Sequence, residues 1–235
     1  MTEETLIELA KSVAETLNIP WENNLEQILR FCAQKPQCFP TRSRLQEPLV
    51  SLNDRTPEQW DLHLTPYLKH YHKDRTQQIT LELVRTKTDP IVDEVLVYFG
   101  RITRETLNTV AKHHRLSMAA ENLIGTLLER YIATITQPIG WIWCCGSTVK
   151  ATDFIGQQGH LLLQVKNRSN SENSSSSGIR VSMAQYGVNI AKWHRIDANS
   201  GATRWEQFPD NGATFELSEE GFQSFVRDAA IPSNS

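Results

Sequence analysis

Residues 150–168 read KATDFIGQQGHLLLQVKNR and predict a turn followed by a buried strand. Asp153 precedes the turn, and the apolar run after it carries two polar residues, Gln164 and Lys166. Side chains alternate along a strand, so Gln164 and Lys166 project from one face while Leu163 and Val165 project from the other. The spacing can therefore bring a carboxylate, an amide and an amine together at one place.

This combination of groups is typical of metal-dependent phosphodiester hydrolysis. A hard cation such as Mg²⁺ takes oxygen ligands, and a lysine beside it can orient water and stabilise developing charge. We expect Asp153 to bind the metal directly and Lys166 to position the attacking water. Gln164 would supply an amide oxygen, or Val165 a backbone oxygen. Because an amide carries no charge, a further carboxylate is expected to help.

The pattern resembles the PD-(D/E)xK nuclease superfamily. Asp153 matches its aspartate, and Gln164-Val165-Lys166 matches the (D/E)xK element, with glutamine in place of the second acid. The superfamily implies an α/β fold with a mixed α+β sheet, and a glutamate on the preceding helix commonly adds an acid. Gly125-x-x-x-Glu129 looks like that element in the mismatch-repair nicking endonuclease. The resemblance thus implies Glu129 as a catalytic and metal-binding acid, with Glu121 as the alternative.

A closer resemblance covers residues 115–205. The segments KATDFI, LLQVKNR and SNSENSSSS, the last at 169–177, are similar to the SinI/AvaII-like type II restriction endonucleases. That family implies Mg²⁺-dependent cleavage of both strands of DNA at GG(A/T)CC. It also implies a homodimer that functions beside a partner DNA methyltransferase.

Residues 167–180 follow the candidate strand directly and predict either a DNA-recognition loop or an inert serine-rich linker. Arginine pairs with guanine acceptors in the major groove, and a carboxylate accepts from cytosine. The side chains able to read bases here are Asn167, Arg168, Asn170, Glu172 and Asn173. Further DNA contacts are expected from Arg180, Lys192 and Arg195.

The charge distribution favours a phosphate partner for the same region. Residues 141–205 carry seven lysines and arginines against three acids, a local charge of +4, whereas residues 206–235 carry −5. The whole chain has a net charge of −3, which argues against sequence-independent coating of DNA. Ordinary surface charge that happens to segregate is the alternative explanation.

The bulk composition is that of an ordinary soluble protein. The chain has 235 residues, 39% hydrophobic and 22% charged, and no apolar run of about 18 residues that could span a membrane. The acidic start MTEETL lacks a signal-peptide layout, so a cytoplasmic protein is expected. Cys144 and Cys145 are expected in a core strand, and no cysteine has zinc-site spacing.

Periodicity and prolines divide the chain into a helical N-terminal region, 1–75, and a nuclease core, 76–235. Helices are predicted over 2–17, 21–33, 57–71, 89–112, 116–132 and 179–190, with Ser117 as an N-cap. Ile91, Val92, Val95, Leu96 and Phe99 are expected to face inward. Strands are predicted over 141–148, from 153 and over 161–166; residues 79–84 fit a strand, or part of a short helix over 76–86.

Three functions fit these observations. The leading one is a site-specific DNA endonuclease. The second is a structure-selective or repair nuclease of the same fold. The third is a non-catalytic DNA-binding protein whose nuclease site has decayed, which the glutamine at position 164 would permit.

Overall fold

The computed structural model describes residues 1–41, 48–82, 89–156, 159–169 and 174–230. Its N-terminal part contains three helices, α1 (Glu3–Thr16), α2 (Asn23–Gln34) and α3 (Pro57–Thr76), as the sequence predicts. The Thr2 hydroxyl accepts from the backbone N–H of Thr5, and Thr56 caps α3 in the same way, which satisfies donors that a helix start leaves unpaired.

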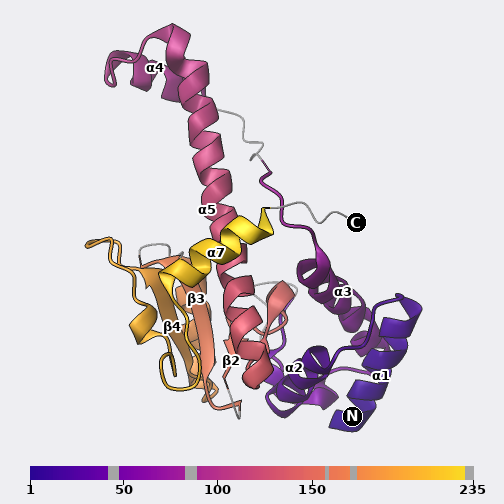
Figure 1. Cartoon of the computed structure of the whole chain (residues 1–235). Coiled ribbons are helices and arrows are strands. Elements are labelled where there is room, and N and C mark those ends of the chain that lie inside the picture. The colour runs from indigo at the N-terminus through magenta and orange to yellow at the C-terminus, as the bar shows by residue number, and fades with distance from the viewer. Residues whose placement is uncertain (42–47, 83–88, 157–158, 170–173, 231–235) are drawn as a thin grey trace.

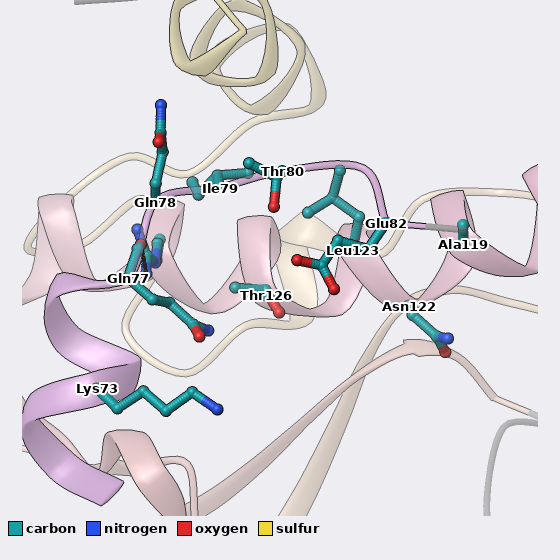
Figure 2. Close-up of a pocket in the computed structure, with 11 residues that line it drawn as sticks. Lys73, Gln77, Gln78, Ile79, Thr80, Glu82, Ala119, Asn122, Leu123 and Thr126 are labelled. Carbon is teal, nitrogen blue, oxygen red and sulfur yellow. Dashed lines mark hydrogen bonds between the residues drawn. The ribbon is translucent and has the colours of Figure 1, made fainter. Parts of the chain in front are cut away.

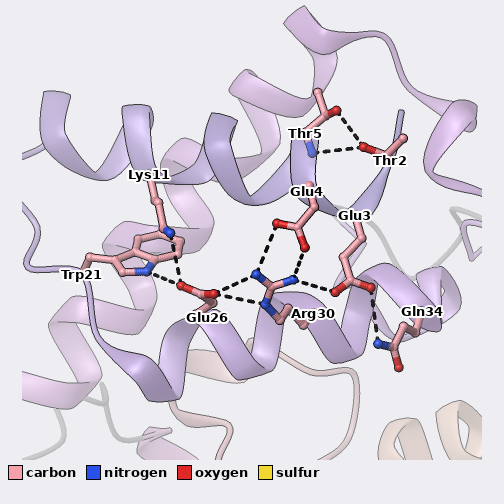
Figure 3. A network of polar contacts seen from close by, with 9 residues as sticks. All are labelled: Thr2, Glu3, Glu4, Thr5, Lys11, Trp21, Glu26, Arg30 and Gln34. Atoms are coloured by element: carbon pink, nitrogen blue, oxygen red, sulfur yellow. Dashed lines mark hydrogen bonds and ion pairs between the residues drawn. The ribbon is translucent and has the colours of Figure 1, made fainter.

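A polar network joins α1 to α2 on their exposed side (Figure 3). The Arg30 guanidinium on α2 pairs with Glu3 and Glu4 of α1 and with Glu26 one turn earlier. Hydrogen bonds from Trp21 and then Arg30 lower the pKa of Glu26 to about 2. Exposed ion pairs stabilise little, so the buried apolar faces of these helices hold them together.

A 30-residue helix, α5 (Leu107–Thr136), crosses the molecule. Ser117 lies inside it, so the prediction of an N-cap there was wrong. No proline or glycine interrupts residues 107–124, and nothing local forces the helix to begin as late as Ser117.

The helix predicted over 89–112 is broken instead. Its first part forms α4 (Pro90–Tyr98). Gly100 and Arg101, which has a left-handed backbone (φ 54°), then separate α4 from α5.

The polar groups of the candidate site are carried by a four-stranded sheet. Its strands are β1 (Ile142–Trp143), β2 (Phe154–Ile155), β3 (Leu162–Arg168) and β4 (Ile190–Ile196), in that spatial order. The first two pairings are antiparallel, whereas β3 and β4 run parallel and are joined through α6 (Ser174–Gln185). The mixed α/β sheet predicted from the sequence is therefore confirmed.

Two boundaries in this region differ from the prediction. The strand expected over 141–148 ends at Trp143, because the turn η5 (Cys145–Ser147) passes close beneath α3. A Cβ on Gly146, which has a φ of 71°, would lie 2.8 Å from the His70 backbone. Cys144 and Cys145 are buried in the core as expected, but outside a strand. The helix expected over 179–190 begins at Ser174 and ends at Gln185.

One hydrophobic core runs from the N-terminal helices to the sheet. Asn24 on α2 joins them: its side chain accepts from the Trp143 backbone N–H (3.1 Å) and donates to the Trp143 carbonyl (2.9 Å). Residues 79–82 form neither the strand nor the helix considered for them, and 83–88 lie outside the described residues. No helix in the described segments is long and apolar enough to cross a membrane.

The C-terminal helix α7 (Glu219–Ala229) packs on α5 and closes an aromatic cluster. Tyr131 of α5 contacts Trp205 and Phe222, with ring centroids 5.7 and 5.5 Å apart. Trp193 and Trp205 are each 5% exposed and lie 5.2 Å apart, so both belong to the core. This packing fixes the sheet beside α5, as Figure 1 shows.

Candidate active site

Two elements bring the predicted acids together. Glu129 lies on α5, which packs against β1 and β3, and Asp153 immediately precedes β2, the strand between them. The Asp153 backbone N–H donates to the Leu163 carbonyl (2.9 Å), and its carboxylate accepts from the Val165 backbone N–H (2.7 Å). The carboxylate is thus held in one orientation by the strand that carries Lys166.

The pKa values of Glu129 and Asp153 show that these two carboxyl groups and the Lys166 amine interact. Burial, and then the charge of Asp153, raise the pKa of Glu129 to about 8, and Lys166 opposes this. Burial raises the pKa of Asp153 to about 6, against the Val165 hydrogen bond and Lys166. The Trp143 indole N–H also donates to Glu129 (3.3 Å). Two carboxylates and an amine therefore form one cluster, called here the Glu129–Asp153–Lys166 cluster.

The donor set of this cluster fits a magnesium ion. Because the pKa of both carboxyl groups is raised, ionising them costs free energy. A divalent cation between them would offset that cost. Within the described ranges, no group of three or more His, Cys, Asp or Glu could hold a metal ion. Mg²⁺ commonly uses one or two carboxylates and keeps several waters, so two acids are enough for it.

Gln164 is placed differently from the expectation. Its side chain is 4% exposed, and its oxygen accepts a 2.6 Å hydrogen bond from the Arg180 guanidinium on α6. A guanidinium only donates, so the amide oxygen faces Arg180. A metal ion on the same oxygen would lie beside that positive charge and be repelled. The structure therefore does not present this oxygen to a metal.

The alternative acid, Glu121, lies outside the cluster. It is exposed and stands eight residues before Glu129 on α5, a distance of about 12 Å along a helix. Of the two glutamates considered from the sequence, the one that lies near Asp153 and Lys166 is Glu129.

The predicted DNA contacts fall into three groups. Arg168 is exposed at the end of β3, and Lys192 lies on β4 beside Gln164 in the parallel register. Asn170, Glu172 and Asn173 lie outside the described residues. The third group bonds inside the protein: Arg195 donates to Asn167, and Arg180 donates to Gln164.

Arg195 is only 7% exposed, and its guanidinium also binds both oxygens of Glu219 on α7, at 2.6 and 2.7 Å. Its charge is neutralised within the fold, which corrects its expected use as a phosphate contact. No local pattern links Arg195 to Glu219, 24 positions later, so the sequence alone does not predict this pair.

A polar cavity of about 590 Å³ lies on another face of α5, against the end of α3 and residues 77–82 (Figure 2). None of the cluster residues lines it. Arg130 at its wall donates to the carbonyls of Asp74 and Gln77, which anchors the C-terminal end of α3 to α5. The cavity is therefore separate from the Glu129–Asp153–Lys166 cluster.

The raised carboxyl pKa values predict how pH affects the metal-free protein. The folded state keeps protons on Glu129 (pKa about 8) and Asp153 (about 6) that the unfolded chain, with ordinary values of 4.5 and 3.8, has released. Stability from these groups is therefore present at low pH and falls between about pH 4 and pH 8.

Mg²⁺ takes carboxylates in their ionised form, so an ion held by Glu129 and Asp153 would raise the melting temperature more at about pH 8.5 than at about pH 5. Thermal unfolding with and without Mg²⁺ measures this, and Glu129→Gln should remove most of the difference between the two pH values. An equal effect of Mg²⁺ at both pH values would contradict the assignment.

Comparison with known proteins identifies the family. The model of the SinI restriction endonuclease family matches residues 7–230, far beyond the segment that carries the resemblance in the sequence. The chain is 37% identical to the type II restriction enzyme Eco47I of Escherichia coli over 229 residues, 95% of this chain and 94% of that protein. It is 38% identical to the type II restriction enzyme SinI of Salmonella infantis over 224 residues, 93% and 91% of the two chains. We conclude that this chain belongs to the SinI restriction endonuclease family.

Proposed function

We propose that the protein cleaves both strands of double-stranded DNA at a short palindrome, GG(A/T)CC, in a Mg²⁺-dependent reaction at the Glu129–Asp153–Lys166 cluster. The observation that carries this is the pair of carboxylates, each with a raised pKa, beside one lysine. Family membership supports the reaction class, and the resemblance to SinI/AvaII-like enzymes supports the target.

The roles of the residues follow from their chemistry. Glu129 and Asp153 would hold Mg²⁺, which supplies positive charge at the phosphate under attack. Lys166 positions the attacking water and stabilises the charge that develops on the phosphate oxygens. Displacement in line with the leaving oxygen leaves a 5′ phosphate. Val165 holds Asp153 through its backbone N–H, and its carbonyl stays a candidate metal ligand.

We further propose that the enzyme works as a homodimer and is paired in the cell with a DNA methyltransferase. A palindromic target presents the same contacts on both strands, so a two-fold dimer can place one cluster on each strand. A methyltransferase that modifies the same sequence would protect the host's own DNA.

Incubation of the protein with unmethylated phage DNA and Mg²⁺ tests the proposed function. Discrete fragments whose ends map to GG(A/T)CC are expected, and Lys166→Ala should produce none. Nicks that depend on DNA structure would instead indicate a repair nuclease. Binding without any cleavage would indicate a decayed nuclease.

The position of Arg180 predicts the outcome of restoring the missing acid. We propose that Arg180 turns the Gln164 amide nitrogen toward the site as a hydrogen-bond donor. Gln164→Glu should then tighten Mg²⁺ binding, since it adds a carboxylate near the cluster, yet lower the cleavage rate, since the donor is lost. Calorimetry with Mg²⁺ and a cleavage assay measure the two effects. Unchanged or faster cleavage would mean that Gln164 contributes its oxygen.

Sequence recognition is proposed to involve Arg168. A good bidentate contact to a base discriminates by about 1–3 kcal/mol, so Arg168→Ala should weaken binding to GG(A/T)CC DNA much more than binding to random DNA. Lys192→Ala, as a phosphate contact, should weaken both alike and reduce the salt dependence. Affinity measurements on both DNAs at several salt concentrations distinguish these roles. Equal losses for Arg168→Ala would assign it to the DNA backbone.

A further inference from the structure

Half of the large apolar side chains that are exposed in the described residues lie at one end of the molecule. Figure 1 shows α4 at the far end of α5, away from the sheet and from α1–α3. Residues 90–118, called here the arm, comprise α4, the turn after it and the start of α5. The exposed fractions on α4 and its C-cap are 64% for Ile91, 48% for Val92, 49% for Val95, 71% for Tyr98 and 85% for Phe99.

Within the described residues, nothing packs over this apolar surface. α4 is nine residues long and buries none of its side chains. A helix this short is unstable in water unless its apolar face packs against something. Contiguous exposed apolar side chains on a soluble protein usually mark an interaction surface.

Charges on the arm indicate what covers it. α4 carries Asp93 and Glu94, of which Glu94 pairs with Arg104 of the same arm (3.0 Å), whereas residues 107–118 at the start of α5 carry Lys112 and Arg115 and no acid. Two arms packed antiparallel about a two-fold axis would bring their apolar faces together. Asp93 of each copy would then face Lys112 and Arg115 of the other.

We propose that the arm is the dimer interface and that its partner is the arm of a second copy of this chain. The inference rests on the proposed function, because each chain carries one Glu129–Asp153–Lys166 cluster and cleavage of two strands at one site requires two. DNA is the less suitable occupant, because its phosphates offer nothing to cover Val95 and Phe99 and would repel Asp93.

The test is the mass of the full-length protein by sedimentation equilibrium, without DNA or Mg²⁺. The parent protein should be a dimer. Val95→Asp combined with Phe99→Asp places two charges in the apolar interface and should weaken association by about tenfold or more. Val50→Asp is the matched control, because Val50 is a 72% exposed valine outside the arm, and it should stay dimeric. Because Val95 and Phe99 are exposed, circular dichroism should show both variants folded.

A monomeric parent protein, or an arm variant that remains a dimer, would overturn the proposal. An arm variant that stays dimeric but loses affinity for DNA would identify the arm as a DNA contact. Lys166→Ala separates this proposal from the proposed function, since it should slow cleavage by about 10²-fold or more and leave the dimer intact. A protein that dimerises through the arm but never cleaves DNA would refute the function and retain the interface.

Discussion

Lys166→Ala is expected to bind DNA with near-parental affinity while cleaving it about 10²–10⁴-fold more slowly, the range for losing a group that moves or positions a proton. Lys166 lies with Glu129 and Asp153 in one cluster, and it opposes the rise in pKa of both acids. Asp153→Ala should lower the rate at least as much. Groups that act as a unit are not additive, so the double variant should be little slower than the slower single variant.

Glu129→Gln and Glu121→Gln form a matched pair for the same experiment. Both change a glutamate on α5 without changing its shape, but only Glu129 lies close to Asp153 and Lys166. Glu129→Gln should weaken Mg²⁺ binding and slow cleavage, whereas Glu121→Gln should stay near the parent. Single-turnover cleavage and Mg²⁺ calorimetry give both quantities. A parental rate in Lys166→Ala, or the reverse order for the two glutamates, would remove the proposed site.

Glu219→Ala is expected to lower the free energy of unfolding by about 1–3 kcal/mol, the cost of leaving the buried Arg195 guanidinium without its carboxylate partner, which is itself 24% exposed. Arg195 is 7% exposed, and Glu219 accepts from its guanidinium and, at 2.9 Å, from the Trp205 indole N–H. Burial works to raise the pKa of Glu219, but these hydrogen bonds outweigh it, and the pKa is lowered. Stability from this pair is therefore lost as the solution becomes acidic enough to protonate Glu219.

Denaturant unfolding measures the loss, and Glu4→Ala is a suitable control. Glu4 pairs with Arg30 on the surface, where its side chain is 69% exposed, so its removal should change the stability little. Equal effects of the two substitutions would mean that Arg195 finds another partner or reaches solvent when Glu219 is absent.

Local sequence patterns predicted much of the secondary structure and the family of this protein. The side-chain period of a strand placed Gln164 and Lys166 on one face of β3, and helical periodicity together with prolines located α1–α3. The mixed sheet and the family were likewise predicted from the residues around Asp153. Such features depend on residues close in sequence, because backbone geometry repeats over a few positions.

Only the tertiary structure decided which distant groups meet. Glu129 and Glu121 share one helix, and only the packing of α5 against β3 brings the first of them to Asp153. The oxygen of Gln164 turns to Arg180 for a similar reason, since α6 folds back over the sheet. Phe99 was expected in the core because it is apolar, but it lies on an arm that the described chain leaves uncovered. Burial and pairing depend on which elements pack together, and no local repeat in the sequence encodes that.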